Sequence, residues 1–276
     1  MTTTTTAPAG WKRYWGFSRT PFTKKLAPSE IHPHPGHREA VARIRWVIDE
    51  GGIGLVTGEV GAGKTTAARA AVESLDAAAH TVIYLANPLV GARGLHHHLV
   101  TALGITPRFH RPALIAQTTD LLARERDERD KQVVLIVDEA HLLDADQLEQ
   151  LRLLTSLDMD SDSPLALLLL GQPTLRRLLR RGSFAALDQR IAVRSHLHPL
   201  DTDQAADYLT HHLTLAGRTD PIFADDATAA ICHAARGLPR QIGNLAVAAL
   251  IAGYTRDNRI VDHDCAAAAI ADHTAD

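Results

Sequence analysis

One short stretch of the chain combines glycines, a lysine and a threonine at a spacing that could hold a phosphate. Residues 58–65 read Gly-Glu-Val-Gly-Ala-Gly-Lys-Thr and lie between an apolar run (53–57) and a helix-forming run (66–75). The glycines let backbone N–H groups turn inward toward phosphate oxygens, and the following helix adds the positive end of its dipole. Lys64 would reach the β and γ phosphates, and Thr65 would offer its hydroxyl to Mg²⁺. The residues expected to contact a nucleotide here are Gly58, Glu59, Val60, Gly61, Ala62, Gly63, Lys64, Thr65 and Thr66.

A pair of carboxylates closes a second apolar run. Val133–Val137 is continuously apolar, typical of a parallel strand covered on both faces, and Asp138 and Glu139 follow it directly. Functional side chains gather at the carboxyl ends of such strands, so Asp138 would hold Mg²⁺ and Glu139 would orient or deprotonate the water that attacks the γ phosphate. The simpler alternative is that both acids only cap the next helix. Together the two motifs favour nucleotide hydrolysis over a chance glycine turn, a capping pair or passive nucleotide storage.

Composition bounds the class of protein. The chain has 276 residues, 45% of them hydrophobic, which suits one large or two modest globular domains. The longest apolar runs, 165–170 and 245–252, are far shorter than the roughly 20 residues of a membrane helix, and residues 1–10 lack the features of a secretory signal. These observations predict a soluble, cytoplasmic protein. Cys232 and Cys265 have neither a disulfide framework nor zinc-ligand spacing.

Charge and histidine content limit the other binding functions. The net charge of −3 gives no overall attraction to nucleic acid, so any such binding must be local. Sixteen histidines include the runs His96–His98 and His211–His212, which we read as partly exposed helix residues. Because adjacent residues on a helix point in different directions, such runs cannot chelate one metal ion. We therefore expect no histidine metal site.

Apolar runs and breakers predict an α/β domain that is followed by helices. Strands are expected at 53–57, 81–86, 133–137, 165–170 and about 191–198, and helices at 37–50, 66–75, 95–103, 113–129 and 145–157, with a polar loop at 158–163. Such alternation predicts a parallel sheet with right-handed crossovers. From residue 201 onward only helical patterns occur, at 201–216, 225–235, 239–254 and 262–272.

Helix signals set the expected domain limits. Asp201 and Asp225 are typical N-caps, and Gly217 and Gly237 are typical C-terminal stops. The predicted domains are an N-terminal tail and aromatic segment (1–22), a nucleotide-binding core (23–199) and a helical lid (200–276). We expect the aromatic residues of 11–22 to anchor that segment to a core.

These motifs together resemble the AAA+ ATPases, and within them the ExeA-like branch related to transposition helpers of the TniB, TnsC and MuB type. The resemblance spans residue 14 to about residue 272. It is carried by Tyr14-Trp15-Gly16-Phe17 with Pro21-Phe22, the 57–66 loop, Val137-Asp138-Glu139-Ala140-His141, residues 151–154, Gly171-Gln172-Pro173, residues 187–191, and Gly237-Leu238-Pro239-Arg240. The resemblance implies a P-loop NTPase fold with sheet order 5-1-4-3-2, ATP and Mg²⁺ as cofactors, and assembly into rings or filaments with shared active sites.

The resemblance also implies roles for four distant residues. Gln172 resembles the sensor after the fourth strand, and the alternative is a turn residue before a proline. Arg190 resembles the arginine finger that reaches a neighbouring subunit's ATP, with Arg194 in reserve, although a structural ion pair is favoured for Arg194 because it lies within a strand. Arg240 resembles the lid sensor, and the alternative is an ordinary exposed arginine at a helix start. The catalytic set implied is Lys64, Glu139, Gln172 and Arg190.

Relatives of this kind divide between membrane-associated secretion helpers and cytosolic helpers that bind DNA. Because the sequence has no membrane span and no domain after the lid, DNA is favoured: we expect an oligomer that forms on duplex DNA with ATP, recruits or activates a DDE-type transposase, and leaves on hydrolysis. Arg93, in the loop 89–94, is the first phosphate contact expected. A basic helix face is the second, unless it is simply solvated. It comprises Arg176, Arg177, Arg180 and Arg181.

Two other functions are alternatives to DNA-linked transposition. A cytosolic ExeA-like ATPase could remodel a protein assembly in a secretion or pilus-type pathway without DNA. A small-molecule kinase is disfavoured, because the arginine features and the helical lid have no use there. Binding to duplex DNA with and without ATP, at two salt concentrations, separates the DNA function from the protein-remodelling function.

Overall fold

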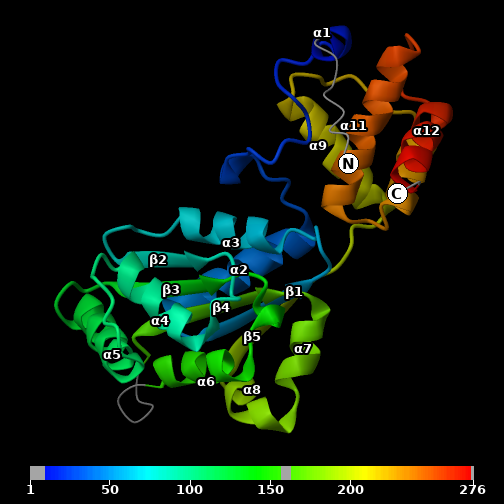
Figure 1. Cartoon of the computed structure of the whole chain (residues 1–276). Helices are drawn as coiled ribbons and strands as arrows, with labels where there is room; N and C mark the ends of the chain where they lie inside the picture. The colour runs from blue at the N-terminus through cyan, green and yellow to red at the C-terminus, as the bar shows by residue number, and fades with distance from the viewer. Residues whose placement is uncertain (1–9, 157–162, 275–276) are drawn as a thin grey trace. The chain divides into compact units, whose positions relative to one another are not determined.

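The computed structural model describes residues 10–156 and 163–274 (Figure 1). Its internal contacts divide the chain into two compact units. The sheet unit comprises Pro35–Glu59 and Lys64–Leu197, and the helical unit comprises the described residues of Met1–His34, Val60–Gly63 and His198–Asp276. The helical unit therefore takes in residues 23–34, which the sequence had assigned to the nucleotide-binding core. The expected polar loop lies outside the described residues, except for Ser163.

The sheet unit is built on five parallel strands in the order β2-β3-β4-β1-β5, which is the order expected. The strands are β1 (Ile53–Gly58), β2 (His80–Leu85), β3 (Gln132–Val137), β4 (Leu165–Gly171) and β5 (Ile191–Leu197). The strands β1 and β4 are buried along their whole length. Continuous burial of this kind explains why both strands are apolar without alternation.

Helices cover both faces of the sheet (Figure 1). They are α2 (Pro35–Asp49), α3 (Lys64–Glu73), α4 (Gly91–Ala102), α5 (Arg111–Asp127), α6 (Ala145–Leu154), α7 (Pro173–Leu179) and α8 (Ala185–Arg190), with short 3₁₀ turns η2 (Ala140–Leu142) and η4 (Gly182–Phe184). Leu55 and Leu135 share a core with leucines of α4, α5 and α6. On the opposite face, a Cβ at Gly54 would meet Val47 of α2. The result is a three-layer α/β/α arrangement.

Two expected surface segments differ from the sequence prediction. α4 begins at Gly91, so Arg93 lies in the first turn of a helix rather than in a loop. α7 ends at Leu179, so Arg180 is its C-cap and Arg181 lies beyond the helix. The prediction of one basic face formed by all four arginines was therefore wrong, because a helical face needs the helix to continue through the second pair.

The helical unit contains α1 (Trp11–Trp15), the 3₁₀ turn η1 (Pro28–Glu30), α9 (Thr202–Leu215), α10 (Asp225–Ala234), α11 (Pro239–Thr255) and α12 (His263–Thr274). The side chain of Asp201 caps α9 by accepting the N–H of Gln204 at 2.8 Å, as expected. Asp225 is not the N-cap of α10, however, because Ala224 occupies that position. Gly217 and Gly237 follow their helices at φ +89° and +68°, which glycine adopts readily.

The aromatic segment packs inside the helical unit. Trp11, Trp15 and Phe17 belong to its buried core, together with residues of α9, α10, α11 and α12. The indole N–H of Trp15 donates to the backbone carbonyl of Leu250 at 3.0 Å. Burying both the ring and its N–H partner anchors the segment strongly. The segment therefore forms part of the helical unit.

Two histidines that were expected to be partly exposed are buried instead. His96 is 1% exposed and lies 3.1 Å from Thr118 Oγ1 and 3.0 Å from Gln150 Oε1, on α5 and α6. Burial lowers the pKa of His96. His212 is 4% exposed, and its ring stacks on Phe22 with centroids 5.1 Å apart. Both residues lie on the apolar face of their helix, which overrides the polar character of the run.

Candidate functional site

The glycine-rich loop has the backbone that phosphate binding requires. Gly61 and Gly63 have φ values of +86° and +98°, a region that side-chain-bearing residues rarely adopt. Lys64 opens α3 directly after the loop, at the carboxyl end of β1. Lys64 is 6% exposed, and its ammonium donates to the backbone carbonyls of Gly58 at 2.9 Å and Glu59 at 3.0 Å. The cation is therefore held beside the loop that would cradle phosphates.

Asp138 is the meeting point of three elements. Its Oδ2 accepts the hydroxyl of Thr65 at 2.7 Å and the hydroxyl of Tyr84 at 2.7 Å, while its Oδ1 accepts the backbone N–H of Glu139 at 2.8 Å. The carboxylate thus joins α3, β2 and the turn after β3. Asp138 is only 6% exposed, so these donors also compensate the loss of water around its charge.

Glu139 follows in an uncommon conformation. Its φ and ψ of +49° and 35° lie in the left-handed region, where a residue other than glycine is unusual. Residues held in this way concentrate at functional sites, because the surrounding structure must compensate the strain. The hydrogen bond from its N–H to Asp138 is one such compensation. The Glu139 side chain is 44% exposed and is therefore accessible to water.

His141 and Tyr84 contact the two acids and received no functional role from the sequence. His141 Nδ1 lies 3.4 Å from Glu139 Oε2, without hydrogen-bond geometry toward any described residue. Tyr84 could have been found from the strand register. It pairs with Ile136 across the parallel strands β2 and β3, and Ile136 and Asp138 are two residues apart and share a face. A tyrosine at that register position places its hydroxyl near Asp138.

The donor set fits a magnesium nucleotide. The hydroxyl of Thr65 and the carboxylate of Asp138 are hard oxygen ligands of the kind that Mg²⁺ takes, usually with several waters and phosphate oxygens. Their oxygens are already 2.7 Å apart. Bound Mg²⁺ would neutralise charge on the β and γ phosphates. Lys64 would bind the same phosphates, and Glu139 would orient a water.

Gln172 and Arg190 lie at opposite ends of the parallel strands, Gln172 at the carboxyl ends and Arg190 at the amino ends. Gln172 follows β4 as the N-cap of α7, at the same edge as Gly58 and Asp138, because parallel strands end together. Arg190 ends α8 immediately before β5, whose first residue pairs with Ile53, the start of β1. At about 3.3 Å per residue, β1 separates that position from the glycine loop by roughly 16 Å. The structure therefore does not bring Arg190 to the loop of its own chain.

The other arginines take various positions. Arg194 donates to the Asp188 carboxylate at 2.9 Å and to its backbone carbonyl at 2.6 Å, so the expected structural ion pair is present. Arg240 is exposed in the first turn of α11, within the helical unit. Arg93 donates to the carbonyl of Phe109 at 3.1 Å and lies over its ring, 5.6 Å from the centroid. The remaining DNA-contact predictions, all exposed, are Arg176, Arg177 and Arg180.

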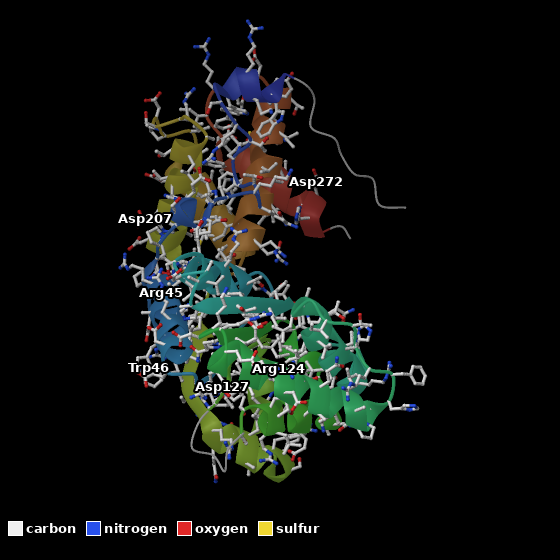
Figure 2. All side chains as sticks on the ribbon, turned by 90° about the vertical axis from the view of Figure 1, so that its left-hand side faces the viewer. Arg45, Trp46, Arg124, Asp127, Asp207 and Asp272 are labelled. Atoms are coloured by element: carbon white, nitrogen blue, oxygen red, sulfur yellow. The ribbon has the colours of Figure 1, made fainter. Side chains whose placement is uncertain are left out.

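The described residues also bear on other kinds of site. No group of three or more His, Cys, Asp or Glu side chains in the described parts of the chain is arranged to hold a metal ion. Among residues 10–156 and 163–274, no helix is long and apolar enough to cross a membrane. A surface pocket of about 490 Å³ lies between α2 and β5 and is lined in part by Trp46, which is 49% exposed. Figure 2 labels the Trp46 side chain. This pocket contains none of the residues of the glycine loop or the acidic pair.

Comparison with known families agrees with this geometry. Residues 47–179 match the family model described as an AAA domain. The order of the five strands is the one that the resemblance to AAA+ ATPases implied.

One curated relative is general secretion pathway protein A of Aeromonas hydrophila, which is 34% identical over 260 residues. The alignment covers 92% of this chain and 46% of that protein, so the chain spans about half the length of this relative.

Solved structures with the same fold include the Orc2 protein of Aeropyrum pernix in its ADP form and Cdc6p from Pyrobaculum aerophilum. The first has a TM-score of 0.70 at 16% identity and covers 91% of this chain and 71% of its own. The second has a TM-score of 0.68 at 18% identity and covers 87% of this chain and 67% of its own. At these identities the similarity concerns the fold alone.

Proposed function

We propose that the chain is a Mg²⁺-dependent ATPase that hydrolyses ATP to ADP and phosphate in order to assemble or remodel a protein complex. The observation that carries the catalytic part is the junction at Asp138, which ties the threonine of the phosphate loop to the strand end that bears Glu139. Lys64, Thr65 and Asp138 would hold Mg-ATP. Glu139 would activate the attacking water, with a general base typically contributing about 10²–10⁴-fold in rate.

The oligomeric part of the proposal rests on Arg190. Arg190 lies at the amino ends of the strands, away from the phosphate loop of its own chain. This position suits a residue that completes the site of a neighbouring subunit. A trans-acting arginine stabilises transition-state charge and is worth about 10³–10⁵-fold where it has been measured. In this scheme Gln172, after the carboxyl end of β4, senses the γ phosphate. Arg240, in α11, responds to the bound nucleotide. Hydrolysis therefore depends on a homo-oligomer.

The secretion-type pathway is favoured because the curated relative carries a general secretion name. The test measures ATP hydrolysis and self-assembly, and it needs no partner protein. Phosphate release and light-scattering mass would be measured with ATP, ADP or no nucleotide. We expect ATP-dependent assembly and turnover that rises more than linearly with protein concentration. Turnover that is strictly proportional to concentration, from a particle that stays monomeric with ATP, would refute shared active sites.

A second candidate function is the DNA-linked one, in which the oligomer coats duplex DNA and recruits or activates a DDE-type transposase. The observation in its favour is the exposed Arg93, stacked on Phe109, which is 79% exposed. The family match and the secretion relative do not point to transposition, so we rank this function below protein remodelling.

Fluorescence anisotropy with duplex DNA, at two salt concentrations and with or without ATP, tests the second function. Salt-sensitive, ATP-dependent binding that weakens in Arg93→Ala would support it, because phosphate contacts release counterions. Absence of binding at low salt would leave protein remodelling as the function.

A further inference from the structure

Tyr84 makes a contact that the expected nucleotide chemistry does not use. It is the second-last residue of β2, and its hydroxyl donates to Oδ2 of Asp138 over 2.7 Å. The ring is 44% exposed, whereas the carboxylate that it contacts belongs to a residue only 6% exposed.

Two hydroxyls share one oxygen of Asp138, and they are not equivalent. The hydroxyl of Thr65 is itself an expected Mg²⁺ ligand, and to bind a cation it must turn its proton away from the metal. The Tyr84 hydroxyl comes from a neighbouring strand and is not part of the expected ligand set. Mg²⁺ would bind a lone pair of the Thr65 oxygen, so both hydroxyls can keep their hydrogen bonds to Oδ2, and Tyr84 is the donor that orients the carboxylate without binding the metal itself.

We propose that Tyr84 is a positioning residue that fixes the Asp138 carboxylate in the orientation that receives Mg²⁺. The proposal rests on the nucleotide site described above and adds a determinant of its metal affinity. Outer-shell hydrogen bonds to ligating carboxylates typically change metal affinity about 10–100-fold when removed. Without the phenol, Oδ2 would keep the Thr65 hydroxyl and lose the donor from β2. The carboxylate would then be held less firmly in the orientation that the metal needs.

The test is the Tyr84→Phe variant, which keeps the ring and removes only the hydroxyl. A fluorescent ADP analogue would be bound with and without Mg²⁺, and free Mg²⁺ would be titrated against the protein–nucleotide complex. We expect unchanged metal-free nucleotide binding and a Mg²⁺ midpoint raised about 10-fold. Mn²⁺ binding, followed by electron paramagnetic resonance, should shift by a similar factor. A Mg²⁺ midpoint within twofold of the wild-type value would overturn the proposal.

Two comparisons distinguish positioning from a general structural effect. Tyr208→Phe removes a phenolic hydroxyl from α9 in the helical unit and should leave the Mg²⁺ midpoint unchanged. In an Asp138→Asn background, adding Tyr84→Phe should change the midpoint no further, because the two residues act as one unit. Additive effects would show that Tyr84 acts elsewhere, and the proposal would fail.

The outcome for the wild-type protein separates this proposal from the proposed function. If the wild type bound no magnesium nucleotide, the ATPase assignment would fail and the role of Tyr84 with it. Wild-type binding together with an unaltered Tyr84→Phe midpoint would overturn only the positioning role.

Discussion

The hydroxyl of Thr65 and the carboxylate of Asp138 are joined by a 2.7 Å hydrogen bond across 73 residues of sequence. The bond links the first turn of α3 to the carboxyl end of β3, so two expected ligands of Mg²⁺ hold each other in place within the sheet unit. Preorganised ligands need less ordering on binding. Changes to either partner should therefore affect the metal and the phosphate sites together.

Lys64→Ala should abolish nucleotide binding. The ammonium now bonded to the Gly58 and Glu59 carbonyls is the charge that would neutralise the β and γ phosphates. Isothermal titration calorimetry with Mg-ATP is the measurement, and Lys131→Ala, at a half-buried lysine that donates to the carbonyl of Ala77, is the matched control. Tight ATP binding by the Lys64 variant would rule out the loop as the phosphate site.

Glu139→Gln should bind ATP normally and lose turnover by about 10²-fold or more, because the amide cannot accept the proton of the attacking water. Filter binding gives the affinity, and phosphate release gives the rate. Glu149→Gln removes a carboxylate from the exposed face of α6, where it pairs with Arg152, and serves as the control. If Glu139→Gln turned over at the wild-type rate, another group would have to activate the water.

Arg190→Ala should leave nucleotide binding intact and remove the part of turnover that depends on assembly. Arg194→Ala is the natural comparison, because that side chain is already paired with Asp188. The side chains of Arg194 and Asp188 are 41% and 30% exposed, so loss of the pair should cost under about 1 kcal/mol of stability. Turnover measured against protein concentration decides the matter: equal loss in the two variants would remove Arg190 as the specific finger.

The stability of the helical unit should fall as pH drops from about 6.5 toward 4. Burial, and then the charges of His211, His32 and Arg19, lower the pKa of His212 to about 4. The unfolded chain therefore takes up a proton at its ordinary pKa near 6.5, while the folded chain does not. The stabilisation is complete above that value and is lost as pH falls, by up to about 3 kcal/mol.

Urea unfolding followed by Trp fluorescence between pH 7.5 and 4 measures this dependence. The His212→Phe variant should flatten the curve, whereas His233→Gln, at an exposed position on α10, should leave it unaltered. A slope that persists in His212→Phe would assign the effect to another group.

Trp15→Phe should destabilise the helical unit by about 2 kcal/mol, because the smaller ring leaves space and the Leu250 carbonyl loses its buried donor. Trp46→Phe is the contrasting change, at a half-exposed site on the sheet unit, and should stay within about 0.5 kcal/mol. Chemical denaturation followed by far-UV circular dichroism measures both. Equal losses of stability in the two variants would mean that the buried indole of Trp15 does not stabilise the helical unit more than an exposed indole would.

Much of the sheet unit could be predicted from local pattern. The runs at 53–57, 133–137 and 165–170 match β1, β3 and β4 to within one residue at each end, because buried parallel strands are apolar throughout. Strand order came from the family resemblance and not from periodicity. α8, at 185–190, was missed, because six residues are too short to show a helical period.

The burial of His96 follows from the spacing of apolar residues in α4. The buried residues of α4 are Ala92, Leu95, His96, Leu99 and Val100, which follow a helical spacing that includes the first histidine of the run. The run His96–His98 conceals this helical spacing, because its three residues are identical. The roles of Gln172, Arg190 and Arg240 stay predictions, since they concern a bound nucleotide or a neighbouring subunit.

The bond between Trp15 and Leu250 also has a temporal consequence, because its partners stand 235 residues apart. A ribosome adding about 5–20 residues per second needs roughly 10 to 50 s to cover that distance. In this interval all five strands are synthesised and can pair. Trp11 and Trp15 are already present but lack the residues of α11 and α12 that bury them in the folded protein. Newly made chains should therefore complete the sheet first and recruit the aromatic segment last, when α11 has left the exit tunnel.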